Sequence, residues 1–202
     1  TTIVEVEAAG VNTVEIMTKD NTTVTAGEMI YFDAWANDTY GNVITTDVLD
    51  FFWYNATIGE FYLTTAGEYD LMASYNEVMS NSVDVTVTPN STASVEIVPY
   101  LDRWITAGET VQFKAWANDT WGNVVTENES DFAWLNATDG LFDEVMVGDY
   151  NVTASYDGVG SDVTIVTVEY GEVDSVELSL SGSQTIIAGG TVNLTASAYD
   201  AY

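Results

Sequence analysis

The sequence repeats itself at a fixed interval. The stretch AWANDTYGN at 34–42 returns as AWANDTWGN at 115–123, and it begins again as ASAYDAY at 196–202. Other segments keep the same spacing of 81 residues without any insertion or deletion, such as Val14-Glu15-Ile16 with Val95-Glu96-Ile97, and Trp53 with Trp134. A unit of this length can bury a core of its own, so the period predicts domains in series rather than the turns of a solenoid.

The repeat also sets the expected domain boundaries. Val4 and Val6 align with Val85 and Val87, near the end of a unit. We therefore expect residues 1–10 to be the last strand of a preceding repeat, 11–91 and 92–172 to be two whole repeats, and 173–202 to be the first strands of a truncated third. The simplest interpretation is a segment of a longer repetitive protein.

Alternation with a period of two predicts β-strands, and helical periodicity is absent. In the segment that follows each Ala-Gly pair, every second residue is apolar in all three copies. These positions are Ile30, Phe32, Ala34 and Ala36; Val111, Phe113, Ala115 and Ala117; and Val192, Leu194, Ala196 and Ala198. This face is the predicted core, and the opposite face, which carries Tyr31, Asp33, Trp35 and Asn37, is predicted to meet solvent.

A second alternating strand follows Gly67, with Tyr69, Leu71, Ala73 and Tyr75 predicted to point inward, and it recurs after Gly148. This pattern resembles the late strand of immunoglobulin-like domains, which carries a conserved tyrosine corner. Trp53 and Trp134 fall in the middle of each unit, where such sandwiches place a core tryptophan. We therefore expect an all-β fold of tandem immunoglobulin-like β-sandwich domains.

The motif T-A-G-E-x-x-x-F-x-A-W-A-N-D-T-(Y/W)-G-N-V resembles the bacterial immunoglobulin-like repeats of intimins and invasins, whose hallmark is D-x-x-G-N at the end of a strand. The matching residues are Asp38, Gly41 and Asn42, and then Asp119, Gly122 and Asn123, while the third copy has Asp200. Val43 and Val124 stand where the family usually has proline. The resemblance implies extracellular stalks that hold an adhesive tip away from the cell, in which most repeats are spacers.

The composition excludes several classes of partner and chemistry. The chain has no Cys and no His, and 3 basic residues stand against 32 acidic ones, for a net charge of −29. Disulfides are impossible, and nucleic acid and anionic membrane surfaces are excluded as partners by repulsion. No apolar run is long enough to span a bilayer. No nucleophile lies beside a base and no phosphate-binding glycine loop is present, so we expect no catalytic site.

The acidic residues suggest a metal site. Asp38, Asp119 and Asp33, with Glu28 nearby, could bind Ca²⁺ at a junction between units, because carboxylate oxygens are its preferred ligands. The alternative is that D-x-x-G-N is an ordinary turn, in which Asp bonds to the backbone and Gly takes a positive φ. The sequence alone leaves both interpretations open.

N-glycosylation sequons are in excess. Nine of the 14 asparagines lie in Asn-x-Ser/Thr, whereas the 40 Ser and Thr residues would give roughly three by chance. The predicted glycan acceptors are Asn21, Asn37, Asn55, Asn90, Asn118, Asn128, Asn136, Asn151 and Asn193. Several of them fall on the polar face of an alternating strand, where a glycan would not disturb the core. The alternative is that Asn and Thr are simply common in turns and exposed strands.

Trp35 and Trp116 occupy the same position in successive repeats and point away from the predicted core. A repeated tryptophan on an outer face predicts a contact surface, with self-association between copies or repeats as one use. Cover by a local loop is the alternative.

Dense sequons, the absence of cysteine and extreme acidity together resemble archaeal surface-layer, sheath or filament proteins. We therefore expect an extracellular, structural and non-catalytic cell-surface protein. The alternatives are the repetitive stalk of an adhesin that presents a binding tip, and the spacer region of a large secreted enzyme.

Overall fold

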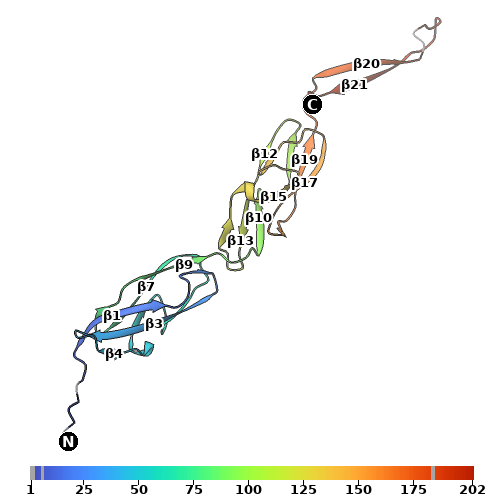
Figure 1. Ribbon diagram of the computed structural model, residues 1–202. Helices are drawn as coiled ribbons and strands as arrows, with labels where there is room; N and C mark the ends of the chain where they lie inside the picture. The colour runs from blue at the N-terminus through green and yellow to red at the C-terminus, as the bar shows by residue number, and fades with distance from the viewer. Residues whose placement is uncertain (1–2, 6, 183–184) are drawn as a thin grey trace. The chain divides into compact units, whose positions relative to one another are not determined.

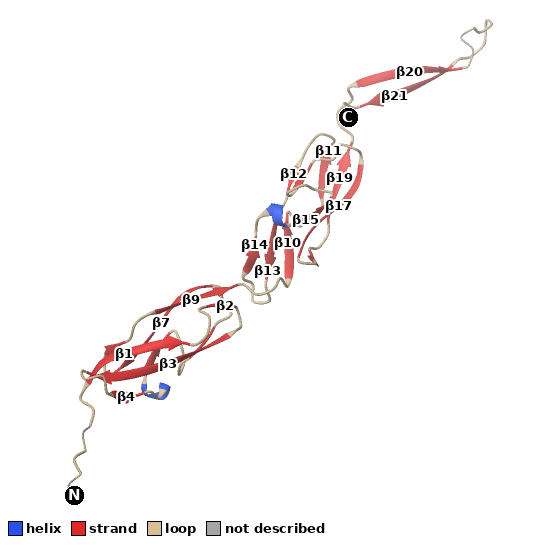
Figure 2. Cartoon of the chain, in the orientation of Figure 1, coloured by secondary structure: helices blue, strands red, loops and turns tan. Residues whose placement is uncertain are grey.

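The structure is a computed structural model that describes residues 3–5, 7–182 and 185–202. The chain forms two compact units. One comprises the residues up to Ser91 together with Asn118–Val125, and the other comprises Thr92–Ala117 together with Thr126–Tyr202. Strands, turns and two short 3₁₀ segments, η1 (Val48–Asp50) and η2 (Glu129–Asp131), make up the described residues (Figure 2). The prediction of an all-β fold is therefore confirmed.

The first set of strands forms two sheets. In one sheet β3 pairs with its neighbours on both sides, and in the other β7 pairs with β9, β5 and β8, while β2 runs parallel to β9. The strands of the first sheet are β1 (Val11–Thr18), β3 (Met29–Asp38), β4 (Val43–Thr45) and β6 (Glu60–Tyr62). Those of the second are β2 (Thr23–Thr25), β5 (Phe52–Tyr54), β7 (Gly67–Tyr75), β8 (Val78–Met79) and β9 (Val83–Thr88).

The second set of strands repeats this arrangement (Figure 1). β17 and β19 are antiparallel neighbours, as β7 and β9 are, and β11 runs parallel to β19. The strands are β10 (Ser94–Val98), β11 (Arg103–Thr106), β12 (Val111–Gln112), β13 (Lys114–Asn118), β14 (Val124–Thr126), β15 (Ala133–Leu135), β16 (Leu141–Phe142), β17 (Gly148–Tyr156), β18 (Val159–Gly160) and β19 (Thr164–Glu169). β17 begins 81 residues after β7, in agreement with the period of the sequence.

The alternation predicted for the strand after each Ala-Gly pair is confirmed in the first two copies. Ile30, Phe32, Ala34 and Ala36 are all buried, as are Phe113, Ala115 and Ala117, whereas Val111 is half-buried. Across the first unit, Phe32 meets Trp53 with ring centroids 6.4 Å apart, so β3 of one sheet packs on β5 of the other. Burial of these side chains is the main stabilising term of such a sandwich.

Both predicted signatures of an immunoglobulin-like core are present. The Tyr69 hydroxyl donates to the Thr65 carbonyl at 2.9 Å, and the Tyr150 hydroxyl donates to the Met146 carbonyl at 2.8 Å, which is the geometry of a tyrosine corner. The Trp53 indole N–H donates to the Val48 carbonyl at 3.0 Å, so its polar atom is satisfied while its ring packs in the core. The predicted immunoglobulin-like β-sandwich is confirmed.

The third copy departs from the prediction. β20 (Ser175–Ser181) and β21 (Asn193–Tyr199) form a two-stranded sheet, and their apolar face is open: Leu178 is 72% exposed and Leu194 is 61% exposed. The expectation that Val192, Leu194, Ala196 and Ala198 are core residues is therefore wrong in this structure. The physical reason is that no second sheet covers this hairpin among the residues that the structure describes.

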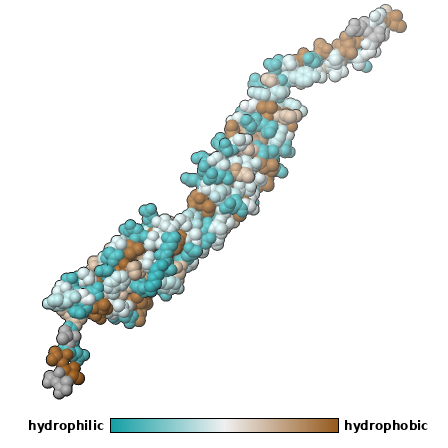
Figure 3. Space-filling view, viewed as in Figure 1, coloured by the Kyte–Doolittle hydropathy of each residue, from teal (hydrophilic) through white to brown (hydrophobic). Residues whose placement is uncertain are grey.

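Residues 3–5 and 7–9, which precede β1, form no strand, and Val6 lies outside the described residues. The division into repeats at 11–91 and 92–172 stays a prediction. The surface of each unit is mainly hydrophilic or neutral, with separate apolar patches (Figure 3). Within the described ranges there is no helix of the length and apolarity needed to cross a bilayer.

Candidate functional site

The motif Asp-Thr-aromatic-Gly-Asn forms a tight turn, called here the Asp turn, at 38–42 and at 119–123. In the first copy Asp38 is buried at the end of β3, and one carboxylate oxygen, Oδ1, accepts from the backbone N–H groups of Tyr40 and Asn42, both at 2.8 Å. The other oxygen, Oδ2, accepts from the Asn42 side-chain amide and from the Ala9 N–H, both at 2.9 Å. Gly41 has a φ of +83°, which an L side chain rarely adopts.

The bond to Ala9 recurs at the same spacing along the chain. Asp119 Oδ2 accepts from the Asn90 N–H, and Asp200 Oδ2 accepts from the Gly171 N–H, both at 2.9 Å. In all three cases the donor lies 29 residues before the aspartate, in the segment that leads into the first strand of the copy. The Asp turn therefore fixes the backbone that precedes β1, β10 and β20.

These hydrogen bonds stabilise the ionised carboxylate. For Asp38, the amide of Asn42 and the N–H of Ala9 outweigh the effect of burial and lower the pKa to about 2. For Asp119, burial acts to raise the pKa, but the bonds from Asn123, Asn90 and Trp121 prevail and the pKa is lowered. Both aspartates are therefore charged hydrogen-bond acceptors at neutral pH.

The Asp turn at 119–123 also contacts the rest of the first unit, to which it belongs. The ring of Trp121 lies over Gly27, so close that a Cβ added at Gly27 would come within 2.5 Å of it. The Asn123 side chain accepts from the Ala66 N–H and donates to the Thr64 carbonyl, both at 2.8 Å. Gly27 lies in the turn at 25–28, closed by Glu28, whose carboxylate accepts from the Thr25 N–H at 2.9 Å. We call this the Gly turn.

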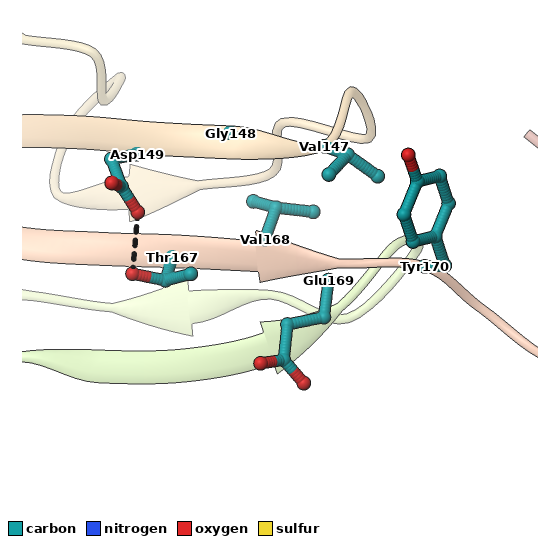
Figure 4. Close-up of a pocket in the computed structure, with 7 residues that line it drawn as sticks. All are labelled: Val147, Gly148, Asp149, Thr167, Val168, Glu169 and Tyr170. Carbon is teal, nitrogen blue, oxygen red and sulfur yellow. Dashed lines mark hydrogen bonds between the residues drawn. The ribbon is translucent and has the colours of Figure 1, made fainter.

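The second unit has the same Gly turn at 106–109, where the carboxylate of Glu109 accepts from the Thr106 N–H at 2.8 Å. The ring of Tyr202 lies over Gly108 as Trp121 lies over Gly27. At the same end of this unit is an open hollow of about 500 Å³ between the starts of β17 and the end of β19 (Figure 4). It is lined by Val147, Gly148, Asp149, Thr167, Val168, Glu169 and Tyr170.

In contrast to these two aromatics, Tyr40 of the first Asp turn covers no Gly turn. Its side chain is 81% exposed, compared with 44% for Trp121. Sequence reasoning quoted this aromatic within the motif but gave it no role. The signal that could have identified it is that the aromatic precedes the Gly-Asn pair in both complete copies of the motif.

The residues predicted to bind Ca²⁺ are used in other ways. β3 places Asp33 and Asp38 on opposite faces, and Asp33 pairs with Lys19 at 2.6 Å on the surface. All oxygen contacts of Asp38 described above are with N–H donors. In the described part of the chain, no group of three or more His, Cys, Asp or Glu residues could hold a metal ion. Binding of Ca²⁺ stays a prediction.

The predicted glycan acceptors fall into two groups. The side-chain amide nitrogen is bound to a protein acceptor in four of them, which are Asn55, Asn90, Asn128 and Asn136. It has no protein acceptor within the described ranges in the other five, which are Asn21, Asn37, Asn118, Asn151 and Asn193. Of these five, Asn37 and Asn118 are half-buried and the rest are exposed. Glycosylation requires this nitrogen to be accessible, so the second group is the better set of acceptors.

Trp35 and Trp116 lie on the outer face of β3 and β13, as predicted, but both are half-buried. Trp116 shares a hollow with Lys114, Glu127 and Glu129, so the segment after β14 covers part of it. Their role as an interface stays a prediction.

No protein-family model matches this chain. No curated protein matches it either. Among solved structures, the Escherichia coli adhesin FdeC is similar with a TM-score of 0.56 and 21% sequence identity, over 98% of this chain and 77% of that one. Domains 4 and 5 of the S-layer protein SbsC give a TM-score of 0.36 at 16% identity, over 79% of this chain and 99% of that one. The Yersinia pseudotuberculosis adhesin InvE gives 0.42 at 11% identity, over 84% and 65%.

At this level of identity the likeness to FdeC concerns the fold, and it agrees with the immunoglobulin-like sandwich described above. The TM-scores for SbsC and InvE are too low to add to it.

Proposed function

We propose that this chain is a structural, non-catalytic part of an extracellular cell-surface protein, in which successive sandwiches serve as a surface layer, sheath or filament. The observation that carries the proposal is the recurrence of the Asp turn, which fixes the entry segment of each copy at the same spacing of 29 residues. A device that repeats along the chain suits a protein whose role depends on regular geometry. A single pocket for one substrate would not require it.

The site chemistry favours this role over catalysis. The hollow of the second unit is open and partly apolar, and its Asp149 carboxylate is bound to the Thr167 hydroxyl at 2.7 Å. The other conspicuous carboxylates, Asp38 and Asp119, are occupied by N–H donors within the fold. None of these groups is arranged as a nucleophile with a base beside it.

N-linked glycans are part of the proposal, with Asn21, Asn37, Asn118, Asn151 and Asn193 as acceptors because their amide nitrogens have no protein acceptor in the described part of the chain. Glycans and negative charge on the outer faces would keep neighbouring chains hydrated. Peptide mapping by mass spectrometry of natively produced protein would test this. Occupancy confined to Asn55, Asn90, Asn128 and Asn136 would contradict it.

The stalk of an adhesin is the second candidate, and the likeness in fold to FdeC, an adhesin of Escherichia coli, favours it. Immunogold labelling of intact cells with an antibody against this chain tests both candidates. An ordered array or fibre that carries label throughout supports the lattice, and isolated projections support the stalk. Label found only after the cells are permeabilised would contradict both.

A further inference from the structure

The contacts of the two Gly turns follow one rule. Trp121 covers Gly27 and Tyr202 covers Gly108, and in both cases the aromatic lies 94 residues after the glycine. Both glycines have a positive φ, +86° and +90°, and a Cβ at either position would collide with the ring. The Gly turn is therefore a docking surface for the aromatic of an Asp turn in each unit.

The Asp turn at 38–42 carries the same groups without a partner. Tyr40 is exposed, and the side-chain oxygen of Asn42 has no donor among the described residues, although its amide nitrogen donates to Asp38. The counterpart of Asn42 is Asn123, whose side-chain oxygen accepts from Ala66 and whose amide donates to Thr64. The first Asp turn thus presents an aromatic ring and an amide that are both used when the second is docked.

The second unit offers the complementary groups. Val145 and Val147 are the counterparts of Thr64 and Ala66, and the described residues provide no acceptor for the Val147 N–H and no donor for the Val145 carbonyl. Val147 also lines the 500 Å³ hollow, beside the ring of Tyr170 (Figure 4). The Gly turn at 106–109, the two free backbone groups and the hollow together are called here the docking site of the second unit.

We propose that the Asp turn at 38–42 docks into the docking site of the second unit on a second copy of this chain. Tyr40 then covers Gly108 in place of Tyr202, and the Asn42 amide bridges the Val147 N–H and the Val145 carbonyl. This inference rests on the proposed structural function and deepens it, because it names the surface through which copies join end to end.

The charges of the two surfaces permit this contact. Residues 39–45 and residues 145–148 contain no charged side chain, whereas the chain as a whole carries a net charge of −29. Figure 4 shows the Glu169 carboxylate turned away from Val147 and Tyr170. Two uncharged surfaces can approach where most of the surface would repel a second copy, above all when salt screens the remaining charge.

Intermolecular paramagnetic relaxation in NMR tests the proposal on the full chain, which has no native cysteine. One copy carries ¹⁵N, and the other carries a nitroxide on Glu144→Cys together with Tyr202→Ser, which frees Gly108. A contact of this size is expected to have a dissociation constant on the order of 1 mM, so both copies are mixed at about that concentration. Salt of about 1 M shortens the Debye length to about 3 Å.

The expected result is that the amide signals of residues 39–42 lose about half of their intensity or more. The matched control carries the nitroxide on Gly158→Cys, at the opposite end of β17 and in open space, and it should leave these signals unchanged. Restoring Tyr202 should weaken the effect, and Tyr40→Ser in the ¹⁵N copy should abolish it. Equal loss with both labels, or no loss at about 1 mM, would overturn the proposal.

The two failures can be told apart. If the labelled turn shows the predicted broadening but the protein is found inside cells, the proposed function fails and the contact between copies stands. If the protein forms a surface array but the broadening is absent, the function stands and the copies join through another surface.

Discussion

The Asp turns at 38–42 and 119–123 have nearly the same sequence and different surroundings. Both form the same hydrogen bonds to their aspartate, and Gly41 and Gly122 share a φ of +83°. Tyr40 nevertheless lies in solvent, whereas Trp121 lies over Gly27. Five residues are thus sufficient to specify the turn, but the use of its aromatic depends on a Gly turn that is distant in the sequence.

The largest effect is expected from removing the buried acceptor of the docked turn. Asp119→Ala would leave the N–H groups of Asn90, Trp121 and Asn123 without their acceptor, at a cost of about 3 kcal/mol in the free energy of unfolding. Asp119→Asn keeps one acceptor oxygen and should cost less. Urea unfolding measures both, and a change for Asp119→Ala within about 0.5 kcal/mol, as at ordinary surface sites, would show that the turn is not held by this carboxylate.

A pair of glycine substitutions separates backbone strain from docking. Gly27→Ala and Gly41→Ala both place an L residue at positive φ, which costs roughly 1–2 kcal/mol. Only at Gly27 would the new Cβ collide with Trp121, since Gly41 has nothing within 4 Å. Gly27→Ala should therefore lower the free energy of unfolding by about 1 kcal/mol more than Gly41→Ala. Equal losses in urea unfolding would argue against a tight contact at Gly27.

A third pair compares the two aromatics directly. Trp121→Ser removes a ring that packs on Gly27, and it should cost about 1 kcal/mol. Tyr40→Ser removes an exposed ring, and it should change the free energy of unfolding by less than about 0.5 kcal/mol. Thermal or urea unfolding of the dilute chain gives both numbers. A larger loss for Tyr40→Ser than for Trp121→Ser would reverse the comparison.

The smallest effect at neutral pH, and the most specific, concerns protonation. The pKa of Asp38 is lowered to about 2 in the folded chain, below its ordinary value of 3.8. Its contribution to stability is therefore fully present above the ordinary pKa and is lost as the pH falls through about 2. Hydrogen exchange should show that the N–H groups of Ala9, Tyr40 and Asn42 remain protected at pH 3. Loss of protection between pH 4 and pH 5 would contradict the low pKa.

The sequence was sufficient to predict the strands and the core. Alternation at Ile30, Phe32, Ala34 and Ala36 has only one outcome when a sheet has one dry face, and Tyr69 and Trp53 identified the sandwich through their spacing. The same alternation misled at Leu194, because a pattern shows which face can be buried but not whether another sheet covers it.

The functional contacts were harder to predict. Asp38 was recognised as a turn residue, yet its bond to Ala9 joins positions 29 residues apart, and no local pattern encodes such a pairing. Likewise, nothing near Trp121 in the sequence indicates Gly27 as its partner. Asp33 and Asp38 looked like joint ligands because they are close in sequence, but the alternation of β3 sends them to opposite faces.

The most direct test of this account is a double-mutant cycle between Gly27→Ala and Trp121→Ser, measured by urea unfolding. If the ring docks on the Gly turn, each substitution removes the same contact, and the double variant should lose about 1 kcal/mol less than the sum of the single variants. The cycle of Gly27→Ala with Tyr40→Ser is the control and should be additive. Additivity in both cycles would contradict the claim that an Asp turn docks its aromatic on a Gly turn.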